Sequence, residues 1–484
     1  MPPPSRLQTP PMGPSATDAN QPPGADAPSN ARAIADILTR FVKYHPQRID
    51  LSLDRMYRLL DDLDNPHATL PPVIHVAGTN GKGSTLAFLD AALTASGLRV
   101  SAYTSPHLVR FAERYRIAGK IIADADLLAL FEEIDERNAG KPITGFEITT
   151  AAAFLAMART SADVVLLETG LGGRYDATNV VAHPAATIIT PVGFDHMAFL
   201  GNTLASIAGE KAAIQKPGVP SIVAAQVEEA ANVIAETAAA TGAPLYRCGK
   251  EWRFEAADGG IRYIREDTAW DLAKPSLTGG HQIENASLAA ACLEVCGFPG
   301  VSAKTVADGI SNARWPYRMQ QVTEGALVDP LPPGSELWLD TAHNPMAAEA
   351  LAATLDDLQR TERRPVHLIL AMLDDKDVGG FIAPLTRHLT SVTAVPIEDE
   401  PRARSASDLV AALANLGRPA RAAPTVTDAV SLLSRNRGPA RVVVTGSHLL
   451  VGAALAANGS HAVGPDTGPA VLWLPHMKAG SFVG

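Results

Sequence analysis

The sequence predicts an α/β protein: a P-loop domain with a mostly parallel sheet, followed by a smaller, Rossmann-like α/β domain. Three observations lead to this prediction. Short apolar runs alternate with stretches of helical character along the chain, which is typical of parallel sheets covered by helices on both faces. A glycine-rich run at residues 78–84 stands between an apolar run and a helix. With 484 residues, the chain is also too long for one hydrophobic core.

The strands of the larger sheet are expected in the first half of the chain. Two amphipathic helices, at residues 34–44 and 54–63, come first. The short run Val73–Ala77 is predicted to be a buried strand, followed by a helix from residue 82 to residue 96. Further strands of the same kind are predicted at residues 99–103, 163–168 and 186–190.

The second half repeats this style with a different sequence. Strands are predicted at residues 336–340, 366–371, 391–395 and 441–445, with helices between them. We expect the boundary after Arg318, so that residues 31–318 form the first domain and residues 319–464 the second. Residues 1–30, rich in Pro, Ala and Gly, are predicted to be a disordered leader, and residues 465–484 an irregular tail.

Composition excludes several classes of protein. The formal net charge is −10, whereas sequence-independent nucleic-acid binding needs a clustered basic surface. The start of the chain has no apolar core, so it is neither a signal peptide nor a membrane span. The three cysteines form no disulfide framework and no zinc pattern. We therefore expect a cytoplasmic protein that binds neither nucleic acid nor a membrane, with a monomer as the default state.

The run Gly78–Ser84 has the features of a phosphate-binding loop. Its glycines let backbone N–H groups approach phosphate oxygens at the N-terminus of a helix. Lys82 could reach the terminal phosphates, and Ser84 could ligate Mg²⁺. The run departs from the common pattern, because Val76 occupies the place of the first glycine and Gly83 separates the lysine from the serine. A glycine turn without a ligand is the alternative, and the lysine and serine favour phosphate binding.

Polar side chains follow three other predicted strands. Glu168 ends one strand, Ser105 follows another, and His196 lies just after a third. Because ligands bind beyond the carboxyl ends of strands in open α/β sheets, these three groups could hold one divalent cation. Each also has a structural explanation, with Glu168 as a helix-cap partner and His196 as a hydrogen-bonded core histidine.

Further candidates carry weaker signals. A glycine-rich loop at residues 169–179 contains Arg174 and Asp176, which could fix a polar substrate. Lys211 is expected early in a predicted helix, where a solvated surface lysine is the ordinary case. In the second domain, Asp340 and His343 follow a strand and could meet a nucleotide or a reacting group, although a turn is the default interpretation.

Together, these strings resemble the folylpolyglutamate synthase and dihydrofolate synthase branch of the Mur ligase family. The most specific matches are HVAGTNGKGST at residues 75–85, SPHL at 105–108, ETGLGGRYDATN at 168–179 and DTAHNP at 340–345. Residues 374–377 and 445–451 match more weakly. The matches run in order over nearly all of the chain that we expect to be ordered, and such an ordered set does not arise by chance.

The resemblance implies a ligase that uses ATP as a co-substrate with one or two Mg²⁺ ions. In such enzymes ATP phosphorylates a carboxylate, and the amine of L-glutamate attacks the acyl phosphate. By resemblance, ATP would contact Thr79, Asn80, Gly81, Lys82, Gly83, Ser84, Asn285, Arg318 and Asp340, and the metal would contact Ser105, Glu168 and His196. Lys82, Lys211 and His343 would be catalytic. Lys211 matches a lysine that is carbamylated in the family, a change that turns a cation into a carboxylate-like ligand.

The resemblance extends to segments that bind the pterin part of the acid. These contain Leu51, Ser52, Leu53 and Asp54, then Thr144, Phe146 and Glu147, and then Tyr175, Asp176 and Ala177. They look like the dihydropteroate-binding segments of members that carry out both reactions. The implied substrates are therefore dihydropteroate, reduced folates, L-glutamate and ATP. The residues alone would indicate helix-start core positions at Leu51 and Leu53 and a buried Phe146.

Three positions depart from the family pattern. Ser52 and Ala213 stand where glycine is usual, and Tyr317 replaces the glycine of a Trp-Pro-Gly-Arg string. Ser52 could crowd the pterin segment, Tyr317 could place Arg318 differently, and Ala213 could alter the helix packing near Lys211. None of these departures removes a functional side chain.

Three alternatives stay open. A peptidoglycan-precursor ligase of the same family would carry a nucleotide-sugar-binding domain ahead of the phosphate loop, but only about fifty ordered residues are expected before Gly78. A non-catalytic ATP-binding protein would not need the set Glu168, His196, Lys211 and Asp340. A monofunctional folylpolyglutamate synthase is the third, although the pterin-type segments favour both activities.

Overall fold

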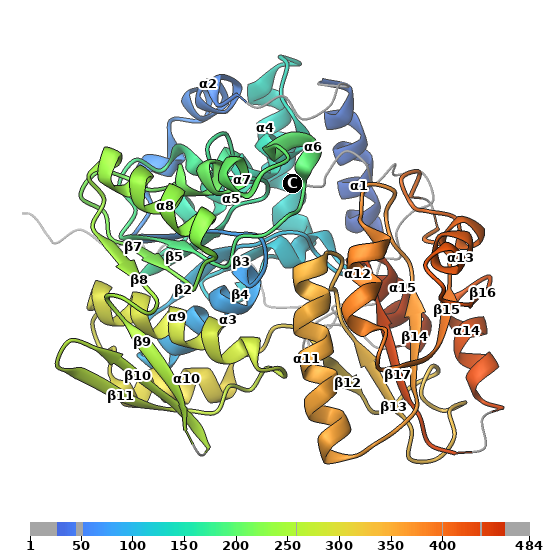
Figure 1. Cartoon of the computed structure of the whole chain (residues 1–484). Helices are drawn as coiled ribbons and strands as arrows, with labels where there is room; N and C mark the ends of the chain where they lie inside the picture. Colours follow the sequence, from blue (N-terminus) through green and yellow to red (C-terminus); the bar gives the residue numbers. More distant parts are fainter. Residues whose placement is uncertain (1–26, 45–51, 258, 399, 436–437, 460–484) are drawn as a thin grey trace, which may run out of the picture.

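Two sheets with wholly buried central strands organise the chain (Figure 1). This computed structural model describes residues 27–44, 52–257, 259–398, 400–435 and 438–459. The central strands are β1 (Val73–Ala77), β5 (Val164–Glu168), β14 (Val366–Leu370) and β17 (Arg441–Thr445), and every one of their residues is buried. The predicted α/β class is confirmed, and continuous apolar runs are what parallel strands covered on both faces require.

The larger sheet has eight strands in the order β4-β3-β2-β5-β1-β6-β7-β8. Neighbouring strands from β2 to β8 run parallel, while β3 and β4 form an antiparallel edge. The remaining bounds are β2 (Val100–Tyr103), β3 (Tyr115–Ile117), β4 (Lys120–Ile121), β6 (Ala186–Ile189), β7 (Ser221–Val223) and β8 (Leu245–Arg247). The strand that enters the phosphate loop, β1, therefore lies inside the sheet, between β5 and β6.

The side chains of successive residues in each strand point to opposite faces of this sheet, as the two-residue period of a strand requires. Val165 and Leu167 of β5 pack in one core cluster, and Val164 and Leu166 pack in another. The first cluster contains residues of α1 (Ala27–Tyr44), α2 (Asp54–Asp62), α4 (Asp124–Asn138) and α5 (Gly145–Arg159). The second contains residues of α3 (Lys82–Ala95), α9 (His281–Cys296) and α10 (Ala303–Asn312). A smaller cluster lies under α7 (Leu204–Ala212) and α8 (Glu228–Thr241).

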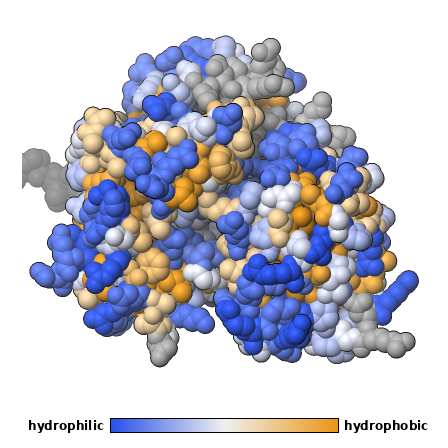
Figure 2. Space-filling view, viewed as in Figure 1, coloured by the Kyte–Doolittle hydropathy of each residue, from blue (hydrophilic) through white to orange (hydrophobic). Residues whose placement is uncertain are grey.

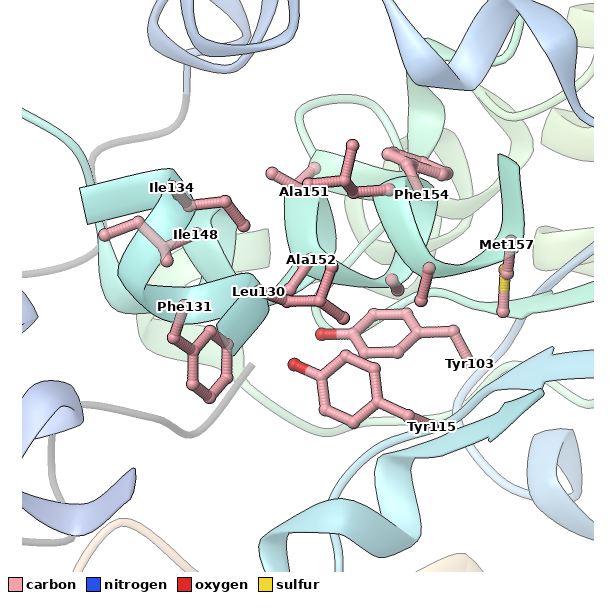
Figure 3. Close-up of a cluster of buried hydrophobic side chains, with 14 of the residues drawn as sticks. Tyr103, Tyr115, Leu130, Phe131, Ile134, Ile148, Ala151, Ala152, Phe154 and Met157 are labelled. Carbon is pink, nitrogen blue, oxygen red and sulfur yellow. The ribbon is translucent and has the colours of Figure 1, made fainter. Parts of the chain in front are cut away.

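Two buried tyrosines fix the start of α5 to the sheet. The ring centroids of Tyr103 and Tyr115 lie 5.4 Å apart, and Figure 3 shows the rings side by side with Ala152 of α5 nearby. The Tyr103 hydroxyl lies 3.1 Å from Oγ1 of Thr149. The Tyr115 hydroxyl donates to the carbonyl oxygen of Thr149 at 2.9 Å. Both buried phenols are thus satisfied, and α5 is held in a defined position over β2 and β3.

A three-stranded antiparallel sheet, in the order β11-β10-β9, packs on the α9 and α10 side of the first domain. Its strands are β9 (Arg253–Ala257), β10 (Gly260–Arg265) and β11 (Thr268–Ala273). Only β10 and β11 contribute buried residues, with Ile261, Tyr263 and Leu272 in the second core cluster, and Phe254 of β9 packs against it partly buried. The sequence analysis did not predict these strands, in which charged residues interrupt the apolar positions.

The smaller sheet has six strands in the order β12-β13-β17-β14-β15-β16. The pair β12 (Gln320–Val322) and β13 (Glu336–Leu339) is antiparallel, and the other pairs are parallel, including β15 (Leu389–Ala394) and β16 (Ala420–Ala422). Helices α11 (Pro345–Thr361), α12 (Val378–Leu385) and α13 (Ala406–Asn415) cover one face. Helices α14 (Val426–Leu433) and α15 (His448–Asn458) cover the other. The predicted boundary after Arg318 falls between α10 and β12.

The ends of the chain require one correction. Helix α1 begins at Ala27, so the prediction of a disordered leader up to residue 30 is wrong for its last residues. Pro28 falls in the first turn of this helix, where a missing N–H costs no intrahelical hydrogen bond. The rest of the leader and the tail predicted at residues 465–484 lie outside the described residues. Among the helices that the structure does describe, none is long and apolar enough to cross a membrane.

A buried arginine ties the start of β17 to β13 and α11. Arg441 is 1% exposed. Its Nε donates to Oε2 of Glu336 at 2.6 Å, and Nη1 donates to Oε1 of Gln359 at 3.0 Å. Burial alone would raise the pKa of Glu336, but the hydrogen bond from Arg441 and its charge hold the pKa below the usual value. Removing one member of such a pair leaves the other as an uncompensated charge.

We expect Arg441→Met to lower the free energy of unfolding by about 3 kcal/mol, because it leaves the Glu336 carboxylate without its main partner. Chemical denaturation followed by circular dichroism measures the change. Arg360→Met is the control, since the Arg360 side chain is 74% exposed and pairs with Asp357 at the surface. There a change within about 0.5 kcal/mol is expected. Equal losses in the two variants would contradict the role given to Arg441.

Candidate active site

The predicted phosphate loop joins the end of β1 to the start of α3. Gly78 and Gly81 have φ angles of +147° and +92°, values that favour glycine. Lys82 opens α3, and its Nζ donates to the carbonyl oxygen of Gly78 at 3.1 Å. Ser84 is buried in the first turn of the same helix. The loop therefore has the strand–loop–helix setting in which backbone N–H groups and a lysine can surround phosphate oxygens.

The unusual Gly83 is explained by packing. A Cβ atom at this position would lie 2.6 Å from the indole ring of Trp315, in the segment that leads to the second domain. A Cβ atom at Gly81 would lie 2.5 Å from Oδ1 of Asn285 on α9. An indole and an amide thus enclose the loop, and any larger residue at either position would displace them. The close approach also places Asn285, one of the residues predicted to contact ATP, at the edge of the loop.

Two of the three predicted metal ligands are in direct contact. The backbone N–H of Ser105 donates to Oε2 of Glu168 at 3.1 Å. Burial raises the pKa of Glu168, and the charges of Lys82 and Arg318 oppose that rise. His196 lies at the N-terminus of α6 (Met197–Leu200), and burial lowers the pKa of its ring to about 3. Its imidazole is therefore neutral, which is the form that binds metals.

These residues fit a magnesium ion that is held mainly by phosphate and water. Within the described part of the chain, no three His, Cys, Asp or Glu side chains lie together as a complete metal site. Mg²⁺ usually keeps several waters and takes only one or two carboxylates together with substrate phosphates. A carboxylate at Glu168 and a hydroxyl at Ser105, beside the phosphate loop, match that requirement. His196 would add a nitrogen ligand from the N-terminus of α6.

Lys211 is buried beneath the phosphate loop. It is 4% exposed, and its Nζ donates to the carbonyl oxygen of Gly78 at 3.0 Å. Burial and the nearby charge of Lys82 lower the pKa of Lys211 to about 7. The prediction that it sits early in its helix is wrong, because α7 begins at Leu204 behind a capping box formed by Thr203 and Ser206. Lys211 therefore lies in the last turn, and that turn points it into the site.

Asp195 joins the two domains. It accepts hydrogen bonds from Nζ of Lys376 at 2.6 Å and from Nδ2 of Asn344 at 2.9 Å, and Nε2 of His343 lies 3.2 Å away. Burial would raise the pKa of Asp195, but the hydrogen bond from His343 and the nearby positive charges hold it well below the usual value. Of these residues only His343 was identified as a site residue from the sequence. The weak match at residues 374–377 was the available signal for Lys376.

The ring of His343 lies where the two domains meet. Its Nδ1 lies 2.9 Å from the carbonyl oxygen of Thr341, and its Nε2 lies 3.2 Å from Oδ2 of Asp195. The second domain thus presents the imidazole of His343 and the amine of Lys376 toward the first domain.

The phosphate loop itself also touches the second domain. The side-chain amides of Asn80 and Asn344 pair at 3.0 and 3.1 Å. Gly193 lies under Met346 of α11, where a Cβ atom would come within 2.0 Å of the methionine methyl group. Figure 2 shows the surface hollowed between the two domains. The residues predicted to bind the nucleotide therefore lie where the domains meet.

The hinge between the domains is held by Asp340. Its Oδ2 accepts from the backbone N–H of Met319, and its Oδ1 accepts from that of Ala342, both at 2.8 Å. Tyr317 takes a φ of +61°, so the backbone keeps the left-handed conformation that a glycine would adopt there. The tyrosine ring is buried in the second domain and contributes to its core. Burial lowers the pKa of the neighbouring Arg318, and the charges of Asp340 and Glu168 oppose that change.

The first predicted acceptor segment leads into α2. Leu51 lies outside the described residues. Oγ of Ser52 accepts from the backbone N–H of Asp54, the first residue of α2, at 3.1 Å. Leu53 packs partly buried against the first core cluster, and the side chain of Asp54 is exposed.

An ion pair joins this segment to the second one. Arg55 bonds both oxygens of Glu147, at 3.1 and 3.2 Å. Glu147 also accepts from the backbone N–H of Thr144 at 2.7 Å, which completes the capping box of α5. The sequence analysis did not single out Arg55, although it directly follows the recognised segment. Phe146 covers Gly170, where a Cβ atom would lie 2.3 Å from its ring.

The third segment contains an exposed and a buried side chain. Tyr175 is 44% exposed, whereas Asp176 is 4% exposed. Oδ2 of Asp176 accepts from the backbone N–H of Leu171 at 2.8 Å, and Oδ1 accepts from Oγ1 of Thr178 at 2.5 Å. Burial raises the pKa of Asp176, and these hydrogen bonds oppose the rise. Asp176 therefore determines the shape of the glycine-rich loop, and Ala177 is buried behind it.

Comparison with known families gives two matches along the chain. Residues 76–293 match the Mur ligase middle domain, and residues 318–448 match the Mur ligase glutamate ligase domain. The dihydrofolate synthase/folylpolyglutamate synthase of Bacillus subtilis is 38% identical over 373 residues, which cover 74% of this chain and 83% of that protein. The protein of the same name from Escherichia coli is 36% identical over 389 residues, covering 80% and 87%.

Solved structures give the same result. The E. coli FolC structure in complex with DHPP and ADP superposes with a TM-score of 0.79 at 33% identity, and the match covers 87% of this chain and 96% of that one. A bifunctional folylpolyglutamate synthase/dihydrofolate synthase with Mn, AMPPNP and L-glutamate bound gives 0.76 at 33% identity, covering 87% and 97%. This chain therefore belongs to the Mur ligase family, in its dihydrofolate synthase/folylpolyglutamate synthase branch.

Proposed function

We propose that this protein is an ATP-dependent ligase that joins L-glutamate to dihydropteroate and to reduced folates. One observation carries the proposal: three parts of the molecule meet at one place. These are the phosphate loop at residues 78–84, the buried amine of Lys211 that contacts it, and the second-domain side chains gathered on Asp195. A protein that only bound ATP would not need donors from a second domain at the phosphate loop.

ATP is proposed to bind along the phosphate loop and the hinge. Its phosphates would lie against Thr79, Asn80, Gly81, Lys82, Gly83 and Ser84, and the rest of the nucleotide against Asn285, Arg318 and Asp340. The close contact between Asn285 and Gly81 supports this placement. The bonds from Asp340 to the hinge backbone would make nucleotide binding sensitive to how the domains meet.

The chemistry needs a leaving group on the acid, because a carboxylate is a poor electrophile. Transfer of the γ-phosphoryl group to the carboxylate forms an acyl phosphate and ADP. Attack by the glutamate amine then forms the amide and releases phosphate and a proton. Lys82 would neutralise charge on the transferred group, and His343 would lie close to the reacting atoms. A divalent ion at Ser105, Glu168 and His196 would supply further charge neutralisation.

Lys211 is proposed to be carbamylated. A neutral amine attacks CO₂ to form an N-carboxylate and releases one proton. The lowered pKa of Lys211, near 7 because of burial, makes the neutral amine available near neutral pH. The product would be an anion among the charges of Lys82 and the proposed metal, which is a better electrostatic match than a second ammonium group.

The acceptor acid is proposed to lie against the three joined segments. The Arg55–Glu147 pair and the contact of Phe146 with Gly170 hold these segments together, and Tyr175 exposes its ring beside them. Both activities are proposed, and a monofunctional folylpolyglutamate synthase is the alternative. A monomeric state, a cytoplasmic location and the absence of nucleic-acid or membrane partners stay predictions of the sequence.

The choice between one activity and two is tested by supplying labelled glutamate and ATP with each acid in turn. We expect glutamate incorporation and phosphate release with dihydropteroate and with tetrahydrofolate. Turnover of tetrahydrofolate alone would refute the dual assignment. Phosphate release that depends on neither acid would leave the protein as an ATP-binding protein without ligase activity.

We expect Lys211→Ala to lower kcat at least a hundredfold, because it removes the proposed anionic ligand beneath the phosphate loop. Added short carboxylic acids such as acetate should restore part of the activity by occupying the space of the carbamate. Lys304→Ala, which removes an 82% exposed lysine paired with Asp308, is the control and should keep full activity. Near-normal turnover of Lys211→Ala would rule out the metal-ligand role.

A further inference from the structure

A chain of three buried side chains connects the phosphate-loop strand to the proposed acceptor loop. His75 lies on β1, and its Nε2 is 2.7 Å from Oγ1 of Thr178. Thr178, in the short helix Ala177–Val180, donates through the same oxygen to Oδ1 of Asp176 at 2.5 Å. His75 and Thr178 are fully buried, and Asp176 is 4% exposed. None of the three is part of the phosphate loop, and the mechanism above uses neither His75 nor Thr178.

The available protons determine which group donates in each of these hydrogen bonds. A hydroxyl has one proton, and Thr178 gives it to Asp176. Oγ1 of Thr178 must therefore accept from His75, so the proton of the His75 ring is on Nε2. The other nitrogen, Nδ1, has no hydrogen-bond partner among the described residues, which is consistent with an unprotonated atom. Burial, together with the charge of Lys216, lowers the pKa of His75 to about 3, so this arrangement persists over the working pH range.

Asp176 in turn holds the backbone of the glycine-rich loop through hydrogen bonds. Its carboxylate accepts from the N–H groups of Leu171 and Thr178, at 2.8 and 3.0 Å. The loop between these contacts is packed on both sides. Gly170 meets the ring of Phe146, and Gly173 lies against the carbonyl oxygens of Glu210 and Lys211, where a Cβ atom would come within 2.6 and 3.1 Å. A shift of the Asp176 carboxylate would therefore move the loop against both neighbours.

We propose that Thr178 and His75 are positioning residues for the acceptor acid, which act by fixing the Asp176 carboxylate and through it the loop at residues 170–177. The chain also ties that loop to β1, so the acid and the phosphates are held to one strand. The inference rests on the proposed function, because it takes this loop to be part of the acceptor site.

The chain offers a closely matched control at Thr187. Thr187 is also fully buried and lies directly opposite His75 in the pairing of β1 with β6. Unlike Thr178, its hydroxyl has no hydrogen-bond partner within the part of the chain that the structure describes. Thr178→Val and Thr187→Val therefore make the same chemical change beside the same histidine, and only the first breaks the chain.

The test measures steady-state kinetics of Thr178→Val, Thr178→Ser and Thr187→Val with dihydropteroate or tetrahydrofolate. We expect Thr178→Val to raise KM for the acid about tenfold, with KM for ATP within about twofold of the parent value, since one hydrogen bond to a carboxylate is lost at the acceptor loop. Thr178→Ser keeps the hydroxyl and should restore the parent KM. Thr187→Val should resemble the parent. Equal effects of the two valine variants, or an equal rise in both KM values, would overturn the proposal.

Hydrogen–deuterium exchange gives a readout that needs no substrate. Peptides that cover residues 170–179 should exchange faster in Thr178→Val than in Thr187→Val, because the N–H of Leu171 loses a fixed acceptor. His75→Gln, which offers an N–H near the place of Nε2, should exchange more slowly there than His75→Leu. If the parent protein turns over no acid, the proposed function fails, and the exchange data alone decide whether the chain orders the loop. Unchanged exchange in Thr178→Val and His75→Leu would refute the proposal that His75 and Thr178 order this loop.

Discussion

The candidate active site depends on one carboxylate that reaches across the domain boundary. Asp195 follows β6 of the larger sheet, yet His343, Asn344 and Lys376, which bond it, belong to the smaller domain. A buried carboxylate without such partners is costly. Asp195 can therefore be buried at low cost only while the two domains are in contact. The phosphate loop and the second-domain side chains that bond Asp195 share a site only while that contact is made.

Much of the fold could be predicted because its strands are unusually simple. β5 and β17 each contain a run of consecutive apolar residues, which the sequence displays directly. The strands β9 to β11 could not be predicted, since their burial comes from packing on α9 and α10 rather than from their own pattern. The place of Lys211 within α7 was predicted wrongly because the helix begins earlier, at the Thr203–Ser206 capping box.

The site was predictable where short strings carry the chemistry, as at Lys82, Glu168 and Asp340. It was not predictable where two residues far apart in the sequence complete each other. Lys376 and Asp195 are 181 positions apart, and Arg55 and Glu147 are 92 apart. The spacing of residues in the sequence does not predict such pairs, because tertiary packing determines which of many charged side chains come into contact. The motifs thus located the site, and the structure identified the partners that hold it in shape.

The contact between Gly83 and Trp315 has a consequence for how this protein can be recombined. Here the indole that closes the loop belongs to the connector to the other domain, and it leaves no room for a side chain at position 83. A transplanted loop of the common pattern would bring such a side chain with it. A side chain at position 83 would therefore require a displaced or smaller residue at position 315.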